Sequence, residues 1–235
     1  IFEGWGSTEA NTNLMNLDNR IGSCGRIPYF ERSNLRLARY DIESGAHLRD
    51  AAGFMIACQP GEIGEVLGLI SSPAPGMYGA AFEGYTSAED TQKKILRDVF
   101  VAGDAWWSSG DLMRYDEDGY FFFVDRIGDT FRWKSENVST NEVGEIINQH
   151  PQVLLSNVYG VEVPKADGRA GMAALALAEG VRQLDLDSFS AHVCSQLPAY
   201  ARPVFLRIQR ELDTTGTFKL VKGELRKQGY DLDQV

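Results

Sequence analysis

The apolar and aromatic run from Tyr120 to Val124 constrains the fold of this chain more than any other stretch. It follows the dipeptide Asp118-Gly119, and a second apolar run precedes that dipeptide. Glycine supplies the positive φ that tight turns need, so residues 112–124 predict a β-hairpin. The next residues, 125–140 (DRIGDTFRWKSENVST), are dense in charge. This polar segment is either a solvated turn or a moving part that handles a ligand.

The pattern changes after this segment. Ser139 and Glu142 form a capping box, which predicts the start of a helix with Val143 and Ile147 on its apolar side. Farther along, apolar runs predict strands and amphipathic runs predict helices. The predicted strands are 153–163, 172–178 and 203–209, and the predicted helices are 185–197 and 220–230. This alternation is typical of a small α+β domain.

In the first half of the chain, glycine residues interrupt the apolar runs more often than in the second half. Residues 60–70 predict a strand in an antiparallel sheet or barrel, and 87–100 predict a short helix capped by Ser87. Residues 1–20 indicate a Gly-rich turn followed by an Asn-rich loop. We place a domain boundary near Gly128. The predicted class is therefore α+β, with an antiparallel β-barrel-like subdomain, a hinge, and a small α+β C-terminal domain.

Charge and cysteine usage exclude several classes of protein. A net charge of −10 disfavours binding to nucleic acid or to an anionic membrane, because both need clustered Lys and Arg. No apolar run approaches the roughly 18 residues of a membrane span. The three cysteines are odd in number and lack CxxC spacing, which favours neither zinc nor a disulfide framework. We expect reduced thiols in a cytosolic setting.

Four short segments carry groups that can bind a nucleotide or an acid. GWGSTE at 4–9 combines small residues and hydroxyls with Glu9, which can hold Mg²⁺ through oxygen. WSSGD ends in Asp111, whose carboxylate can accept from two ribose hydroxyls. Asp125-Arg126 is an ion pair or a ligand contact, and TTGTFK leads to Lys219. Taken singly, each segment also fits a plain turn or a solvated charge.

Taken together and in this order, the segments resemble the adenylate-forming superfamily of acyl-CoA synthetases. GDTFRWKSENVSTNEV and TGTFK, with LRDVF, NVYGVEVP, GRAGMA and YARPVFLRIQ, are similar to the very-long-chain acyl-CoA synthetase and fatty acid transport protein family. The resemblance implies that residues 1–127 are the C-terminal part of the large AMP-binding domain. Residues 128–235 would then be the mobile C-terminal domain that carries the catalytic lysine.

The resemblance also implies an activity and its residues. The parent enzyme would be an acid–thiol ligase, which activates a long- or very-long-chain fatty acid with ATP to an acyl-adenylate and passes the acyl group to coenzyme A. For the nucleotide, the resemblance implies that Trp5 stacks on adenine, with Gly6 and Ser7 in the same turn, and that Asp111 binds the ribose with help from Arg126. For the reacting groups, it implies that Thr8 contacts the α-phosphate and Glu9 binds Mg²⁺. Lys219 would lie between the fatty acid carboxylate and the α-phosphate.

The resemblance also implies a role for the polar segment 125–140. In this family the C-terminal domain swings between two orientations, and Gly128 falls at the hinge position. The second orientation turns Trp133, Lys134 and Ser135 toward the tunnel for coenzyme A. Close relatives have Gly where this chain has Ser135. Phe218 replaces the Gly that most superfamily members carry before the lysine.

The Ser/Thr/Gly-rich phosphate loop of the family is absent, and the chain begins without Met, so we expect a fragment that is inactive alone. Two alternatives stay open: a non-catalytic module that binds nucleotide or coenzyme A, and a lipid-transport protein. The expected partners are fatty acid, ATP and coenzyme A, with no nucleic acid. We expect the parent in the cytoplasm or on the cytoplasmic face of a membrane, and its oligomeric state is left open.

Overall fold

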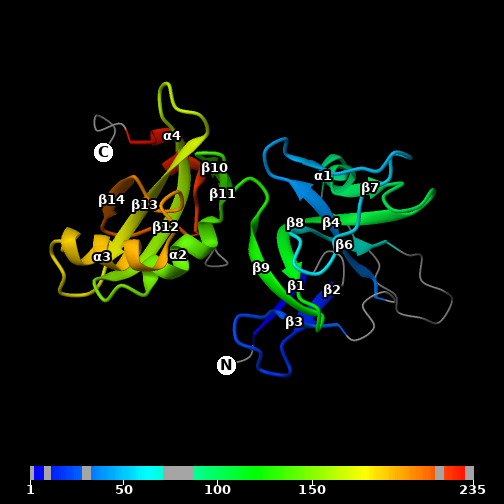
Figure 1. The fold of residues 1–235 in the computed structure, drawn as a ribbon, viewed down its shortest axis with the longest axis horizontal. Helices are drawn as coiled ribbons and strands as arrows, with labels where there is room; N and C mark the ends of the chain where they lie inside the picture. Colours follow the sequence, from blue (N-terminus) through cyan, green and yellow to red (C-terminus); the bar gives the residue numbers. More distant parts are fainter. Residues whose placement is uncertain (1–2, 8–11, 28–32, 71–86, 215–219, 231–235) are drawn as a thin grey trace. The chain divides into compact units, whose positions relative to one another are not determined.

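The computed structural model describes residues 3–7, 12–27, 33–70, 87–214 and 220–230. The chain divides into two compact units, Ile1–Ile127 and Gly128–Val235 (Figure 1). The boundary between them falls directly before Gly128.

Unit 1 is built on an antiparallel sheet. Among the described residues this sheet has seven strands in the order β3-β9-β8-β6-β4-β5, with β7 also paired to β8. Its strands are β3 (Gly25–Arg26), β4 (Leu35–Asp41), β5 (Ala46–His47), β6 (Gly64–Leu69), β7 (Ile95–Arg97), β8 (Ala105–Tyr115) and β9 (Tyr120–Arg126). A separate hairpin joins β1 (Gly4–Ser7) to β2 (Thr12–Met15), and α1 (Ala88–Lys93) precedes β7.

The core of unit 1 lies on the strands around the predicted hairpin. Phe121 of β9 is fully buried with Leu37 of β4 and Val66 of β6, and its ring stacks on that of Tyr115 at 5.6 Å. The hairpin prediction is confirmed, since β8 and β9 pair antiparallel and Gly119 in their connection has φ +80°. The described strands form an open sheet instead of a closed barrel, and the α+β class holds.

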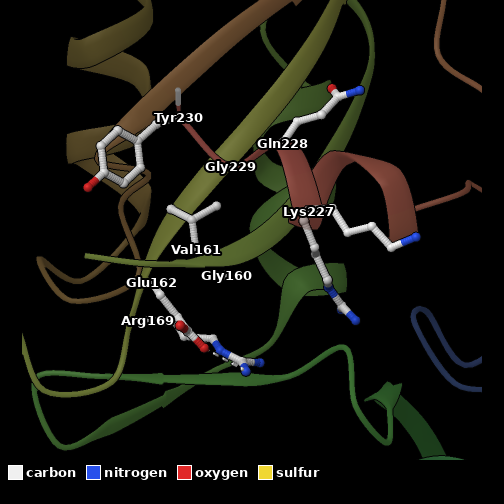
Figure 2. Close-up of a pocket in the computed structure, with 9 residues that line it drawn as sticks. Gly160, Val161, Glu162, Arg169, Lys227, Gln228, Gly229 and Tyr230 are labelled. Atoms are coloured by element: carbon white, nitrogen blue, oxygen red, sulfur yellow. Dashed lines mark hydrogen bonds and ion pairs between the residues drawn. The ribbon is translucent and has the colours of Figure 1, made fainter. Parts of the chain in front are cut away.

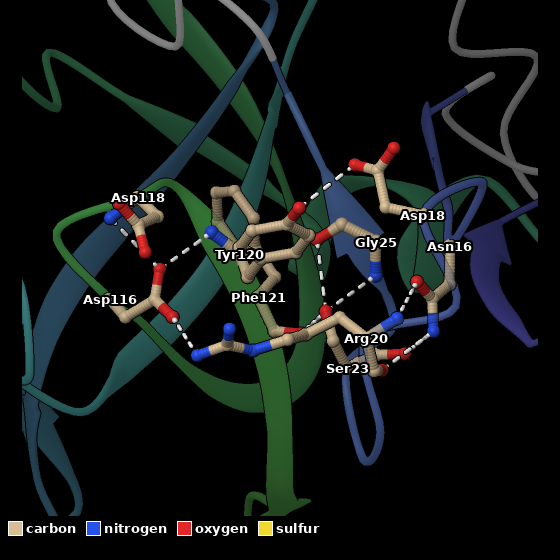
Figure 3. Close-up of polar contacts among 9 residues, drawn as sticks. All are labelled: Asn16, Asp18, Arg20, Ser23, Gly25, Asp116, Asp118, Tyr120 and Phe121. Atoms are coloured by element: carbon tan, nitrogen blue, oxygen red, sulfur yellow. Dashed lines mark hydrogen bonds and ion pairs between the residues drawn. The ribbon is translucent and has the colours of Figure 1, made fainter.

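Polar contacts fix the connection between β2 and β3 to this hairpin (Figure 3). Ser23 donates its hydroxyl to the carbonyl of Phe121 at 2.9 Å, and the Tyr120 hydroxyl donates to Asp18 at 2.9 Å. The guanidinium of Arg20 lies 5.3 Å from the centroid of the Tyr120 ring and pairs with Asp116 at 3.7 Å. These contacts hold β3 against β9, at one edge of the sheet.

Unit 2 is a three-stranded sheet with helices on both faces. β12 (Val153–Glu162) pairs antiparallel with β13 (Arg169–Leu177), and β13 pairs parallel with β14 (Phe205–Gln209). The helices in its described part are α2 (Thr140–Asn148), α3 (Leu186–Gln196) and α4 (Gly223–Gln228). A short hairpin, β10 (Phe131–Trp133) and β11 (Glu136–Val138), precedes α2.

Alternation along the strands of unit 2 separates two apolar cores, because successive side chains of a strand point to opposite faces. Val158 and Ala173 belong to the core formed with α2 and α3. Their neighbours Tyr159 and Met172 belong to the core that includes Leu225 of α4. The predicted capping box is present on the Ser139 side, where the hydroxyl accepts from the backbone N–H of Glu142 at 3.1 Å.

Three local predictions were wrong. The helix predicted over 87–100 ends at Lys93, and Ile95 begins β7 because this segment pairs with the edge of β8. Residues 4–7, predicted as a turn, are a strand paired with β2. WSSGD, which taken singly fits a plain turn, lies inside the long strand β8.

Candidate functional site

A bulge in β8 carries Asp111. On β6, Glu65 pairs with Leu112 and Leu67 pairs with Ser108, so two steps along β6 match four steps along β8. The residues between, 109–111, leave the ladder, and Gly110 takes φ +80°. Bulges of this kind re-aim the side chains that they carry. The bulge thus accounts for the Gly in WSSGD.

Asp111 meets two other predicted site residues. Its Oδ2 accepts from the indole N–H of Trp5 at 2.8 Å, and its Oδ1 lies 3.6 Å from Nε of Arg126. Arg126 faces Asp111 across the β8–β9 ladder. The Asp111 side chain is 18% exposed and that of Arg126 is 45% exposed. Residues far apart in the sequence therefore gather around one half-buried carboxylate.

The other residues of the predicted nucleotide and acid site are only partly described. Gly6 and Ser7 lie in β1, where their Cα partners are Asn13 and Thr12. Thr8, Glu9 and Lys219 lie outside the described residues. In the described part of the chain, no group of three or more His, Cys, Asp or Glu side chains gathers as a metal site.

Gly128, the predicted hinge, has φ +86°, in the left-handed region. Its neighbour Asp129 is tied into unit 2 by two cations. Lys222 Nζ lies 2.8 Å from Asp129 Oδ2, and Arg226 donates to Oδ1 at 2.7 Å. Lys222 also donates to the Thr140 hydroxyl at 2.7 Å. The residue after the predicted hinge is thus anchored to α4, through Lys222 just before the helix and Arg226 in its last turn.

The β10–β11 hairpin holds Trp133, Lys134 and Ser135. Its two-residue turn, Lys134-Ser135, has φ +52° and +67°, the positive pair that a type I′ turn requires. Both turn residues are exposed, and Lys134 Nζ lies 5.9 Å from the centroid of the Trp133 ring. The hairpin therefore presents a cation and an aromatic ring together.

Two glycines, Gly160 and Gly168, lie directly against β10 and form the surface on which this hairpin packs, called the seat of the hairpin below. A Cβ on Gly160 would lie 2.7 Å from Phe131 Cγ, and one on Gly168 would lie 2.3 Å from the carbonyl oxygen of Arg132. No side chain fits at those distances, so the missing Cβ atoms let β10 lie directly against β12 and the start of β13.

Unit 2 also contains a pocket of about 610 Å³ beside the end of α4 (Figure 2). Its lining residues are Gly160, Val161, Glu162, Arg169, Arg226, Lys227, Gln228, Gly229 and Tyr230. Arg169 pairs with Glu162 at 3.4 Å, and Lys227 pairs with Glu224 at 2.8 Å. None of the predicted site residues is in this set, and we assign the pocket no role in the proposed chemistry.

Glu65 of β6 is a buried carboxyl group beneath the bulge, and the sequence patterns did not predict its place there. Its only local signal is a carboxylate inside the apolar stretch GEVLGL. Charged residues are almost never fully buried unless they are paired.

Comparison with known proteins identifies the class. Residues 142–219 match the family described as the AMP-binding enzyme C-terminal domain. An anthranilate CoA ligase, AuaEII, solved with anthranoyl-AMP, is 25% identical and covers 97% of this chain and 39% of its own, with a TM-score of 0.72. The o-succinylbenzoate CoA synthetase of Bacillus subtilis covers 98% and 41% at 22% identity, with a TM-score of 0.69. The fold is that of the adenylate-forming enzymes.

Sequence comparison with curated proteins finds relatives among the long-chain fatty acid transport proteins. Long-chain fatty acid transport protein 1 of Mus musculus is 43% identical over 98% of this chain, and protein 2 of Rattus norvegicus is 41% identical over 98%. Nearly the whole chain is therefore similar to the long-chain fatty acid transport proteins, as the resemblance in the sequence indicated. It spans 35% and 37% of the length of these two relatives. Among the described residues, no helix is long and apolar enough to cross a membrane.

Proposed function

We propose that the full-length protein containing this chain is a fatty acid–CoA ligase. In the first half-reaction the fatty acid carboxylate attacks the α-phosphorus of ATP, which gives acyl-adenylate and pyrophosphate. In the second, the thiol of coenzyme A attacks the acyl carbonyl, loses its proton and displaces AMP. The meeting of Trp5, Asp111 and Arg126 around one carboxylate is the observation that supports this proposal.

The Asp111 carboxylate fits a ribose. Each ionised carboxylate oxygen has more than one acceptor site, so Trp5 and Arg126 leave capacity for two hydroxyl donors. Its partial exposure gives a ligand access. The guanidinium of Arg126 lies near the negative charge of Asp111 through Nε, and its other N–H groups can still donate to a ligand. Trp5 packs in part against the core of unit 1, and the remaining surface of its ring is the proposed contact for an adenine.

Lys219 and Glu9 act on the reacting anions in this proposal. A carboxylate and a phosphate must approach each other, and a flexible ammonium between them stabilises the charge that develops in the transition state. Bound Mg²⁺ supplies further neutralisation of phosphate charge, and Glu9 offers it the oxygen ligand that it prefers.

Coenzyme A is the co-substrate of the second half-reaction. The exposed turn of the β10–β11 hairpin offers Lys134 to a phosphate or carbonyl oxygen and Trp133 to an apolar chain. A rotation at Gly128 would exchange this hairpin for Lys219 at the reaction centre. A polar segment with aromatic surface suits a part that faces water in one state and a ligand in the other.

The names of the curated relatives support a second candidate, a role in the transport of long-chain fatty acid. In that role the protein would bind the fatty acid at the cytoplasmic face of a membrane. Radiolabelled fatty acid, ATP and coenzyme A, given to the purified full-length protein, separate the two. A ligase forms labelled acyl-CoA in detergent solution and releases one pyrophosphate per thioester, whereas a carrier binds the label without either product. Release of the protein from washed membranes by salt or by detergent tests membrane association.

The variant Lys219→Ala tests the proposed chemistry. Adenylation is expected to fall by about 10² to 10³, the usual cost of removing a positioned transition-state donor. Thioester formation from supplied acyl-adenylate should fall far less, because the lysine acts in one orientation only. Lys93→Ala, at an exposed position on α1, is the matched control and should leave both rates unchanged. Equal losses in both half-reactions would contradict the exchange of orientations.

A further inference from the structure

Glu65 is a buried carboxylate whose described partners are a hydroxyl, an amide and an imidazole. Its side chain is 1% exposed. Oε1 accepts from the Ser108 hydroxyl at 2.5 Å and from the backbone N–H of Gly110 at 2.8 Å, and Oε2 lies 2.6 Å from Nε2 of His47. The carboxylate thus joins β5, β6 and β8. Burying a carboxyl group this deeply is costly unless it is hydrogen-bonded, and both oxygens of Glu65 have a polar partner.

The two contacts to β8 lie at the bulge. Because residues 109–111 leave the β6–β8 ladder, the N–H of Gly110 points to the Glu65 carboxylate instead of a carbonyl of β6. On the other side, the carbonyl of Gly110 accepts from the N–H of Ile127 at 2.8 Å. Gly110 is therefore held from both edges, and the next residue is Asp111.

We propose that Glu65 is a positioning residue for nucleotide binding: it holds the 109–111 bulge so that the Asp111 carboxylate faces Trp5 and Arg126. His47 in turn orients Glu65, and the Tyr40 ring packs edge-on against His47, with 5.2 Å between the ring centroids. This inference rests on the proposed role of Asp111 in binding the ribose. It adds a residue that touches neither nucleotide nor fatty acid, and that acts through the amide of Gly110.

Two substitutions of Glu65 separate positioning from charge. Glu65→Gln keeps an Oε1 carbonyl for Ser108 and Gly110 and offers an N–H₂ to a neutral His47 Nε2. Glu65→Ala removes the group that binds Ser108, Gly110 and His47. Glu62→Gln is the matched control, because Glu62 pairs with Arg39 and accepts from the N–H of Gln59, away from the bulge. Asp111→Ala reports on the nucleotide site itself.

The experiment measures AMP affinity by calorimetry, and the KM values for ATP and fatty acid, in the full-length protein. Glu65→Ala is expected to weaken AMP binding and raise the KM for ATP by about 10- to 100-fold, the scale of a misplacement near 1 Å. The KM for fatty acid should stay within about threefold, and Glu65→Gln should stay near the parent in all three. Equal changes in both KM values, or a loss in Glu65→Gln as large as in Glu65→Ala, would overturn the proposal.

Two further measurements keep the inference separate from the proposed function. If Asp111→Ala binds AMP as tightly as the parent, the ribose role of Asp111 is wrong. Hydrogen exchange at the Gly110 amide of the 235-residue chain still tests the placement: exchange must speed up in Glu65→Ala and stay slow in Glu65→Gln. If Glu65→Ala does not fold, Ser108→Ala replaces it. This variant removes one of the two contacts to β8 and should weaken AMP binding about threefold, and unchanged affinity would overturn the proposal.

Discussion

At the scale of the residue, Ser135 is held in a conformation that suits glycine. Its φ of +67° costs an L-residue roughly 1 to 2 kcal/mol, because Cβ approaches the following carbonyl oxygen. We predict that Ser135→Gly raises the free energy of unfolding of the 235-residue chain by about 1 kcal/mol. Chemical denaturation followed by near-UV circular dichroism measures it, and Tm should rise by about 2 to 4 °C.

The control for this prediction is Ser135→Ala, which removes the hydroxyl and keeps the Cβ. Its stability should match the parent, since the strain comes from the Cβ. If Ala stabilises as much as Gly, the hydroxyl is the source of the cost. In the full-length protein the same Ser135→Gly change should lower the KM for coenzyme A or speed the thioester step, with ATP and fatty acid parameters near the parent.

The cysteines offer a second prediction at this scale. Burial raises the pKa of Cys58 to about 12, an effect to which Glu62 adds and which Arg39 opposes, whereas Cys194 is exposed. The thiolate is the nucleophile, and at pH 8 only about one in ten thousand Cys58 thiols is ionised in the folded chain. Iodoacetamide followed by peptide mass spectrometry should label Cys194 quickly and Cys58 only after unfolding. Labelling of native Cys58 at the rate of Cys194 would contradict this assignment.

At the scale of the element, the seat of the β10–β11 hairpin gives a sharp test. A Cβ on Gly160 would meet Phe131 at 2.7 Å, so the hairpin or β12 must shift to admit it. We predict that Gly160→Ala destabilises the chain by about 1 to 3 kcal/mol, the usual cost of overpacking. Loss of exchange protection should be largest in 131–138, and urea denaturation measures the total.

Gly144 in α2 is the matched control with the opposite sign. A Cβ there would meet Ser156 Oγ at 3.6 Å and Val158 at 3.8 Å, which is ordinary contact. Glycine inside a helix costs roughly 0.5 to 1 kcal/mol relative to alanine, so Gly144→Ala should stabilise by that amount. The same Gly-to-Ala change then moves stability in opposite directions at two positions of one unit.

Some elements could be predicted from local sequence signals, and others could not. α2 and the β8–β9 hairpin were predictable, because the Ser139 cap and the turn at Gly119 are local signals. β7 and β1 were not, because their strand character comes from pairing with β8 and β2. At the site, the family resemblance implied roles for Asp111 and Arg126, and the structure places these two residues opposite each other across one ladder. Glu65 was missed since its partners lie on other strands, and no local pattern records them.

At the scale of the whole molecule, the two units meet in sequence at Gly128, and the residue after it belongs firmly to unit 2. Asp129 is bound by Lys222 and Arg226, so the first residues of unit 2 move with α4 and with the chain leading away from Lys219. A rotation at Gly128 would then carry Asp129 and α4 together. We propose that Gly128 supplies the backbone freedom for that rotation, since its φ of +86° is one that few other residues adopt.

We predict that Gly128→Pro in the full-length protein blocks thioester formation and leaves adenylation largely intact. Proline fixes φ near −65°, so the variant cannot adopt the φ of +86° and is locked in whichever orientation tolerates it. Gly128→Asn is the matched control, because asparagine tolerates left-handed backbone and should keep both half-reactions. Pyrophosphate release measures adenylation, and acyl-CoA formed from supplied acyl-adenylate measures the second step. If Gly128→Pro supports both at parental rates, the rotation takes place at another residue.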